Sequence, residues 1–425
     1  MTEKVECSNP GCSTLILPET GAKTGGRCMP CNREKQAAER EDFVRRNRRD
    51  VDPFQGVQDR VEIIKIVHQE RAYDPLINWL RYPTPPDRLY AELTPIDLRR
   101  LTDHVEALLR DEDETAEDIL LCLAAFTDAS LEACLEVMIE RRVLWPSLPF
   151  RRASTSQRDR LLEQIEMAVA TSGVGLDHAL LALAWIGDAQ VVERFGDWAR
   201  NRPGWASQLN LAPDRYSHEA GWELDSDGHR RDIFFRSCTA LVKGSAPSAP
   251  ESTTRIPAEG EGVCPWCGRA LTILVDLVPS DFDLAGLDLP GLQVVTCDAC
   301  TAFGTVFGIL DGDGRGRLDP GNVRPSYLPD DLETCPPLPA RTLVAAGRRS
   351  SHWAANWFLQ TTFSQVGGLP TWIQDFDYPI CPGCSRTMKF LAQIAHDEIQ
   401  DHAEGFYYAF VCADCRRTAT SYQQS

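Results

Sequence analysis

The chain has 425 residues, of which 43% are hydrophobic, and its formal charge is −18 at neutral pH. This length accommodates about two to four domains, and the hydrophobic fraction excludes a chain that is disordered throughout. The net negative charge disfavours non-specific binding to nucleic acid or to an anionic membrane, since both need a cationic surface, and it permits a basic protein partner.

The sequence predicts neither a membrane span nor a secretory route. The first residues, MTEKVECSNPGC, lack the apolar core of a signal peptide, and no apolar run approaches the ~20 residues of a membrane span. We therefore expect a cytoplasmic protein, in which thiols stay reduced. The 16 cysteines of the chain then need an explanation other than structural disulfides.

Their spacing supplies one, because twelve of them form three groups of four. The groups are Cys7, Cys12, Cys28 and Cys31; Cys264, Cys267, Cys297 and Cys300; and Cys381, Cys384, Cys412 and Cys415. Two cysteines on a tight turn can direct both thiolates at one ion, and a second turn completes a tetrahedron. The alternative is redox-active or disulfide-bonded CxxC, which the repetition disfavours. We predict three structural zinc sites.

The three predicted zinc sites are closed rather than catalytic. A catalytic zinc keeps a coordination position for water or substrate, commonly with histidine or carboxylate ligands, whereas each group here offers four thiolates. The remaining cysteines are scattered, and Cys122 and Cys134 fall in apolar helical stretches, where cysteine is usually a small core residue.

In chain order, the first predicted element is a zinc knuckle over residues 1–40. The segment 32–57 connects this knuckle to a helical region, and contains VRRNRR directly after EREDF. The arginines could contact phosphate, but the adjacent acids favour the solvated face of a helix.

A helical domain is predicted over 55–243. Residues 119–142 and 179–202 align without a gap, and each copy reads as an apolar helix, a turn with Asp128 or Asp188, and an amphipathic second helix. Further helices are predicted over 58–71, after the cap Thr94, and over 156–170. This pattern resembles HEAT-type repeats, which stack helix pairs into a solenoid; a plain helical bundle is the alternative.

A linker is predicted over 244–262, where GSAPSAPESTTRIPAEGEG is rich in Pro, Ser, Gly and Glu and has no periodicity. Two similar zinc-ribbon-like β modules come next, over 263–360 and 361–425. The stretch CPWCGRALTILVD of the first aligns with CPGCSRTMKFLAQ of the second, and in both an apolar strand leads into the second cysteine pair. We infer an internal duplication with the order knuckle, strand, connection, strand, knuckle. The expected fold class is therefore α+β and multidomain.

Two smaller features carry weaker signals. LDGDGRGRLDP resembles the start of a calcium loop, but Arg315 stands where an acid is needed, so a hairpin turn rich in Gly and Asp is the better prediction. His218, Glu219 and Asp225 could form an unrecognised catalytic site, although no HExxH spacing accompanies them.

The C-terminal residues carry a family resemblance. Gly367 to Gln374, which read GGLPTWIQ, and Phe390 to Ile394, which read FLAQI, resemble the motifs of bacterial YwqG-like domains. The resemblance covers residues 363–421, and a weaker one reaches the eukaryotic ribosomal-protein chaperones of the Tsr type, which combine a GGxPxWL segment with repeated CxxC modules. YwqG-like proteins often occur in bacterial toxin–immunity settings, but the resemblance implies no catalytic residue.

These features favour a non-catalytic protein-binding factor whose partner is basic, either a toxin domain held by an immunity protein or the client of a dedicated chaperone. The first alternative is nucleic-acid binding through the ribbons, and the second is an enzyme at the site of His218. The basic residues that nucleic-acid binding would use are few: Arg269, Arg315, Arg317, Arg386, Lys389, Arg416 and Arg417.

Overall fold

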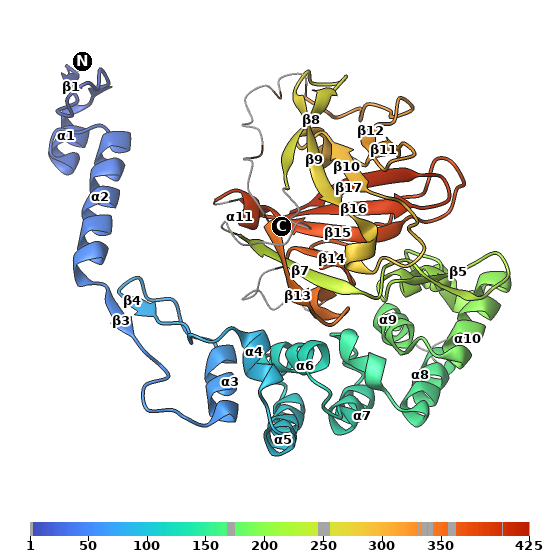
Figure 1. Cartoon of the computed structure of the whole chain (residues 1–425). Coiled ribbons are helices and arrows are strands. Elements are labelled where there is room, and N and C mark those ends of the chain that lie inside the picture. The colour runs from blue at the N-terminus through green and yellow to red at the C-terminus, as the bar shows by residue number, and fades with distance from the viewer. Residues whose placement is uncertain are drawn as a thin grey trace. The chain divides into compact units, whose positions relative to one another are not determined.

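The computed structural model describes residues 3–167, 175–244, 256–329, 332, 338, 343–355, 363–401 and 403–424. The chain divides into two compact units, Met1–Thr84 and Pro85–Ser425 (Figure 1). It combines helices, sheets and three four-cysteine clusters. The boundary between the units lies inside the region 55–243 for which we expected one helical domain.

The first unit is small and has little apolar core. Its elements are β1 (Val5–Glu6), β2 (Leu15–Ile16), α1 (Pro18–Thr24), α2 (Met29–Asn47), β3 (Arg49–Val51), α3 (Arg60–His68) and β4 (Ile77–Trp79). Cys31 is the buried residue of the 19-residue helix α2. At the end of that helix, Arg45 and Arg46 form ion pairs with Asp42, which agrees with the prediction of a solvated helix face.

The second unit begins with stacked helices. They are α4 (Pro86–Ala91), α5 (Pro95–Asp111), α6 (Thr115–Phe126), α7 (Glu132–Arg141), α8 (Thr155–Met167), α9 (Leu176–Ile186) and α10 (Ala189–Arg200). Thr94 caps α5 as expected, in a reciprocal capping box with Asp97. The predicted helix over 156–170 corresponds to α8, and residues 168–170 lie outside the described part of the chain.

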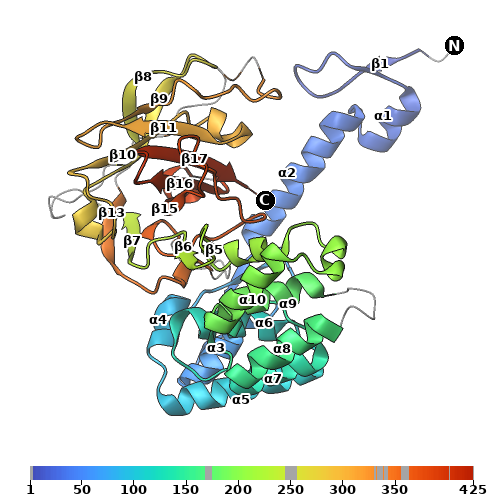
Figure 2. The ribbon, with the colours of Figure 1, turned by 90° about the vertical axis from the view of Figure 1, so that its right-hand side faces the viewer.

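Both copies of the aligned helical segment fold as helix pairs, α6 with α7 and α9 with α10. The first helix of each pair lies next to the β-sheet half of the same unit: the ring centroid of Phe126 in α6 is 4.6 Å from that of Trp353, and that of Trp185 in α9 is 6.1 Å from His352 (Figures 1 and 2). Because α6 and α9 are covered on several sides, both helices are apolar around most of their circumference.

The helical region ends earlier than predicted. Strands β5 (Trp222–Leu224) and β6 (Arg230–Asp232) form a hairpin, and β7 (Cys238–Lys243) joins the main sheet. An expectation of helix up to residue 243 was therefore wrong: β7 is only six residues long and pairs with β13 and β14, which lie more than 100 residues further along the chain. Pairing at that separation leaves no local signal.

Two antiparallel sheets form the rest of the unit. Their remaining strands are β8 (Ala258–Val263), β9 (Ala270–Leu277), β10 (Leu292–Thr296), β11 (Val306–Leu310), β12 (Gly316–Leu318), β13 (Leu343–Arg348), β14 (Gln365–Gly367), β15 (Lys389–Ala395), β16 (Phe406–Cys412) and β17 (Arg417–Gln423). A four-residue helix, α11 (His396–Ile399), comes directly after β15. The larger sheet has the order β12-β11-β17-β16-β15-β14-β7-β13, and the smaller has the order β10-β9-β8.

This topology changes two boundaries that we predicted. Strand β8 occupies the last part of the predicted linker 244–262, whereas residues 245–255 lie outside the described ranges. The two β modules also share one sheet, because β11 of the first pairs with β17 of the second from Val306↔Thr420 to Ile309↔Arg417. The modules 263–360 and 361–425 are therefore fused rather than separate.

The core lies between the two sheets. Leu274 of β9 and Val294 of β10 belong to the same buried cluster as Tyr407, Ala409 and Val411, which alternate along β16. The intervening residues of β16 face the other way: for example, the Phe410 ring lies 5.9 Å from Phe390. Strand β16 is thus buried on both faces, which explains its continuous apolar sequence FYYAFV.

The helix repeat provides a matched stability test at Asp188 and Asp128. Asp188 caps α10 by accepting the N–H of Val191 and forms a 2.5 Å ion pair with the mostly buried Arg158. Asp128, at the equivalent position before α7, is fully exposed and does not cap that helix. We predict that Asp188→Ala lowers the free energy of local opening of α10, measured by native-state hydrogen exchange, by about 1–3 kcal/mol.

The matched variant Asp128→Ala should change the opening of α7 by less than about 0.5 kcal/mol, as is usual for an exposed side chain. Equal effects of the two substitutions would contradict this assignment of the cap.

Candidate metal centres

All twelve predicted ligands come together in the expected groups of four. In each group the four sulfur atoms lie within 4.8 Å of one another. One sulfur–sulfur distance can be given for each group. It is 3.7 Å for Cys12–Cys28 in the first, 3.8 Å for Cys264–Cys300 in the second and 3.7 Å for Cys384–Cys412 in the third. A tetrahedron of thiolates around zinc, with Zn–S of about 2.3 Å, has an edge of about 3.8 Å. Each group therefore has the dimensions of a four-sulfur zinc site.

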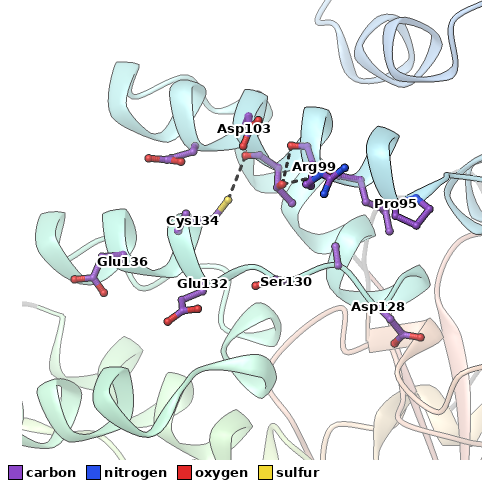
Figure 3. Close-up of a pocket in the computed structure, with 13 residues that line it drawn as sticks. Pro95, Arg99, Asp103, Asp128, Ser130, Glu132, Cys134 and Glu136 are labelled. Carbon is purple, nitrogen blue, oxygen red and sulfur yellow. Dashed lines mark hydrogen bonds between the residues drawn. The ribbon is translucent and has the colours of Figure 1, made fainter.

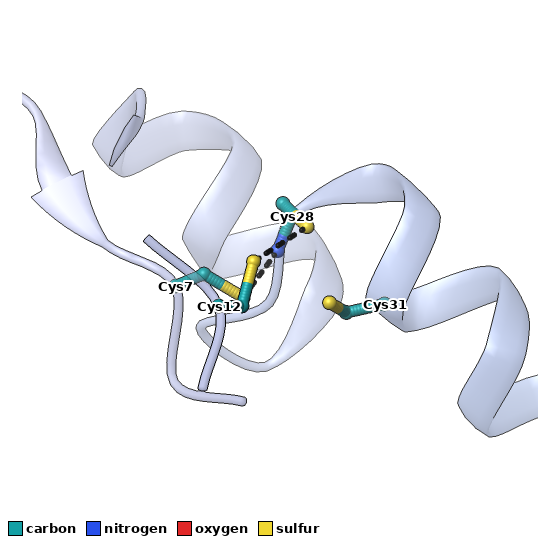
Figure 4. Close-up of side chains that lie close together, drawn as sticks. All are labelled: Cys7, Cys12, Cys28 and Cys31. Atoms are coloured by element: carbon teal, nitrogen blue, oxygen red, sulfur yellow. Dashed lines mark hydrogen bonds between the residues drawn. The ribbon is translucent and has the colours of Figure 1, made fainter. Parts of the chain in front are cut away.

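The first cluster is built from a hairpin and a helix start. The β1–β2 hairpin carries Cys7 and Cys12, and the N–H of Cys7 donates to the carbonyl of Thr14 at 2.9 Å. Cys28 is the N-cap of α2, and Cys31 lies in its first turn (Figure 4). The N–H of Cys28 also donates to the sulfur of Cys7 at 3.2 Å. Unpaired N–H groups at a helix start stabilise negative charge, which suits thiolate ligands.

The second and third clusters share one backbone design. In the first turn of each, a cysteine N–H donates to the carbonyl of the following arginine, at 2.7 Å from Cys264 to Arg269 and 2.8 Å from Cys381 to Arg386. The residue before the arginine is left-handed in both turns, with φ of 75° at Gly268 and 57° at Ser385. The predicted order of knuckle, strand, connection, strand, knuckle is present in both, which supports the inferred duplication.

The strands leaving and entering these turns are paired as a zinc ribbon requires. Strand β9 pairs with β10 and β15 with β16, both antiparallel, and each pair contains a register irregularity: between Val294 and Val295 in the first, and between Phe390 and Ala392 in the second. Each cluster therefore joins the turn before the first strand of a hairpin to the turn after its second strand. The long gaps between cysteine pairs are occupied by the hairpin strands and their connection.

An ion pair beside each of these two clusters was not predicted. Arg269 pairs with Asp298 at 3.3 Å, and Arg386 pairs with Asp414. Both aspartates lie inside the second CxxC of their module, in CDAC and CADC, so the shared Arg and Asp of the two aligned modules were the signal that could have revealed the pairs. Asp298 is 5% exposed and also accepts the N–H of Leu338, so it fixes the knuckle to a neighbouring segment.

The donor set is chemically uniform. The twelve clustered cysteines form no disulfide. The other cysteines among the described residues, Cys122, Cys134 and Cys238, are buried away from the clusters, as expected for Cys122 and Cys134. Four sulfur donors already complete a tetrahedral shell around an ion, so the residues fit a structural metal rather than one that binds a substrate.

His218 and Asp225, two of the sequence candidates for a catalytic site, lie in different surroundings. His218 is 1% exposed, packs against Tyr378 at a ring distance of 5.8 Å, and burial lowers the pKa of its imidazole to about 3. Asp225 lies in the exposed β5–β6 turn, where it accepts the N–H of Asp227 and His229. Asp225, Asp227 and His229 lie close together on the surface, but they are not joined to His218.

The β11–β12 turn and the basic residues of the ribbons were also the subject of predictions. The segment LDGDGRGRLDP forms the β11–β12 hairpin turn, in which Asp311 accepts the N–H of Asp313 and Arg315, as predicted. Among the basic residues proposed for nucleic-acid contact, Arg269, Arg386 and Arg417 are paired with carboxylates, the last with Asp319. The ribbons therefore present less positive charge than their composition suggests.

The GGLPTWIQ segment is held in place by buried glutamines. Gln365 donates to the carbonyl of Leu369 at 2.8 Å, and Gln393 accepts the N–H of Thr371 at 2.8 Å while donating to Phe363. Both glutamines are fully buried. At Gly367, φ is 71° and an added Cβ would lie 1.9 Å from the Ser237 carbonyl oxygen, so glycine is required there.

Comparison with known proteins identifies a relative over the whole chain. The chain is 42% identical over 431 aligned positions to a protein of Salmonella typhimurium described as "Uncharacterized protein YpfL", and the alignment covers 100% of both chains. The chain belongs to the same family as YpfL. No family model matches it, and no solved structure does. The resemblance to YwqG-like domains stays a prediction.

The second and third clusters each provide a separate metal-binding test. We predict that the reduced protein binds three zinc ions and that Cys300→Ser and Cys384→Ser each lower this to two, since a three-thiolate site binds zinc more weakly. Native mass spectrometry counts the ions directly. Cys134→Ala is the control, because Cys134 is buried in α7 and should leave three ions bound. Three tightly bound ions in either serine variant would contradict the assignment.

Proposed function

We propose that the protein is a non-catalytic, zinc-stabilised factor that binds a basic protein partner. The observation that carries this proposal is the closed form of the three metal sites: every cluster offers four sulfurs, so the metal stabilises the fold and leaves no coordination position for a substrate. Three bound ions would fix the hairpins and leave the surrounding surfaces for recognition.

A groove on the helices supports a basic partner. It has a volume of about 710 Å³ and lies between α5 and α7 (Figure 3). The charged residues that line it are Arg99, Asp103, Glu106, Asp128, Glu132 and Glu136. Five carboxylates thus face one guanidinium, which favours a ligand with positive charge.

Part of this negative charge is already neutralised. Glu106 pairs with Arg110 at 2.9 Å, and Glu136 pairs with Arg160. Asp103 and Glu132 are exposed and make no ion pair among the residues that the structure describes. These two carboxylates are the ones that a basic partner would reach without first breaking an existing ion pair.

The helix pairs fit the same role. Stacked pairs of the HEAT type present a continuous surface built from successive helices, and α6/α7 followed by α9/α10 would be two such units. Within this proposal, an immunity protein that holds a toxin domain and a dedicated chaperone for a basic client differ only in the identity of the bound protein. Identifying the captured protein separates the two roles.

A capture experiment tests the proposal. We predict that the immobilised full chain retrieves one dominant basic protein from its native cell extract, and that the complex weakens as salt concentration rises. The double variant Asp103→Lys/Glu132→Lys should reduce capture about tenfold, because it places two positive charges in the groove.

The matched control is Glu163→Lys/Glu193→Lys, which makes the same change in net charge at exposed positions of α8 and α10 outside the groove. It should capture within about twofold of the unmodified chain. Recovery of no specific protein would contradict the proposed function, and equal losses in the two double variants would contradict the assignment of the groove.

A further inference from the structure

A second cavity lies where the helices meet the β-sheet half of the same unit. It has a volume of about 450 Å³ and is separate from the α5–α7 groove. Its walls come from α6 and α9, the turn after α7 that contains Trp145, the single residues Glu219 and Ala355, and residues 370–375, which are the end of the GGLPTWIQ motif and the Asp375 that follows it. The cavity therefore brings together residues that no sequence pattern connects.

Three tryptophans line this cavity: Trp145, Trp185 and Trp372. Neighbouring rings hold each of them. The ring centroid of Trp145 lies 5.7 Å from that of His178, and the ring centroid of Trp372 lies 5.0 Å from that of Tyr408. The indole N–H groups of Trp185 and Trp372 have no hydrogen-bond partner among the described residues, and Trp185 is only 7% exposed. Buried indole N–H groups normally have one, so these two are unusual.

The backbone that carries Trp372 is rigid. Thr371 is held on both sides: its N–H donates to Gln393 at 2.8 Å, and its carbonyl accepts the hydroxyl of Tyr408 at 2.5 Å. Further along the chain, Gln374 donates its N–H to Gln423 at 3.1 Å. These bonds hold the backbone on both sides of Trp372 in place, and such preorganisation lowers the entropic cost of binding.

Two carboxylates also line the cavity, those of Glu219 and Asp375. Glu219 is partly buried, and its carboxylate makes no hydrogen bond or ion pair within the described ranges. Burial, followed by the negative charge of Asp375, raises the pKa of Glu219 to about 7. An ionised carboxylate in this setting is costly, and a cation placed between the two acids would offset that cost.

Aromatic faces and carboxylates are the two groups that attract organic cations in proteins. Two buried histidines of this region, His352 beside Trp185 and His218 next to Glu219 in the chain, do not oppose such a ligand by their charge. Burial, together with Arg151 and Arg152, lowers the pKa of His352 to about 3, and burial lowers the pKa of His218 to about 3. Both imidazoles are therefore neutral at physiological pH.

We propose that the cavity between Trp145, Trp185, Trp372, Glu219 and Asp375 binds a cationic side chain, an arginine or a lysine, of the basic protein partner. The proposal rests on the proposed function for the identity of the partner, but the recognition chemistry belongs to the cavity alone. The aromatic rings contact the cation and its aliphatic stem, and the two carboxylates supply the opposite charge. The GGLPTWIQ segment then acts as one wall of a recognition site.

The test uses the full chain labelled with 5-fluorotryptophan, whose ¹⁹F resonances are assigned with single Trp→Phe variants. The probes are N-acetyl-arginine methylamide and N-acetyl-lysine methylamide, with N-acetyl-citrulline methylamide as the uncharged isostere of the first. We predict saturable shifts of Trp145, Trp185 and Trp372 with at least one cationic probe. The citrulline probe should bind at least tenfold more weakly.

Glu219→Gln keeps the shape of the side chain and should weaken binding of the cationic probe at least fivefold. Glu193→Gln, on the exposed face of α10, is the control and should leave it unchanged. The resonances of the remaining tryptophans and a zinc count of three show that each variant is folded. No shift with either cation, equal binding of the citrulline probe, or unchanged binding to Glu219→Gln would each overturn the proposal.

The same variants separate this proposal from the proposed function. If the full chain captures a basic protein and Glu219→Gln captures it equally well, the cavity is not the recognition site and the proposed function stands. If the cationic probe binds but no basic protein is captured, the cavity binds cations and the proposed function is wrong.

Discussion

The structure depends on pairs of cysteine turns brought within the reach of one ion. In the second and third clusters, one turn precedes the first strand of an antiparallel hairpin and the other follows its second strand, so both lie at the open end of the hairpin. An ion held there fixes strand register as well as the turn positions. In the first unit, which has few buried apolar residues, the cluster forms a small core of its own, in which Cys7, Cys28 and Cys31 pack with Ile16. Small modules of this kind need metal because their apolar burial alone is insufficient.

The duplication has a structural consequence beyond the two metal sites. The strands of the first hairpin form the small sheet, whereas those of the second form the centre of the eight-stranded sheet, and the two sheets pack face to face around Leu274, Val294 and Tyr407. The downstream strand β11 of the first module then pairs with β17 of the second. The two copies therefore cover each other, and each buries the face that the other would expose.

Features with local chemistry could be predicted from the sequence, and features set by distant pairing could not. The paired cysteines of each metal-binding turn, the cap at Thr94 and the turn at Asp311 depend on residues a few positions apart, and the structure contains all three. Strand β7 was assigned to the helical region because its partner strands, β13 and β14, lie far along the chain, and pairing at that distance leaves no local signal in the sequence. The tryptophan cavity was also missed, since Trp145, Trp185 and Trp372 become neighbours only after the helices pack on the sheet.

The central claim is that the metal sites are closed four-sulfur sites that stabilise a surface for binding. X-ray absorption at the zinc edge of the purified, reduced protein measures this most directly, because it reports the atoms around each ion. The account predicts an average of four sulfur neighbours at about 2.3 Å and no lighter ligand. A nitrogen or oxygen neighbour at about 2.0–2.1 Å would show that at least one ion has a position open to water or substrate, and would contradict the account.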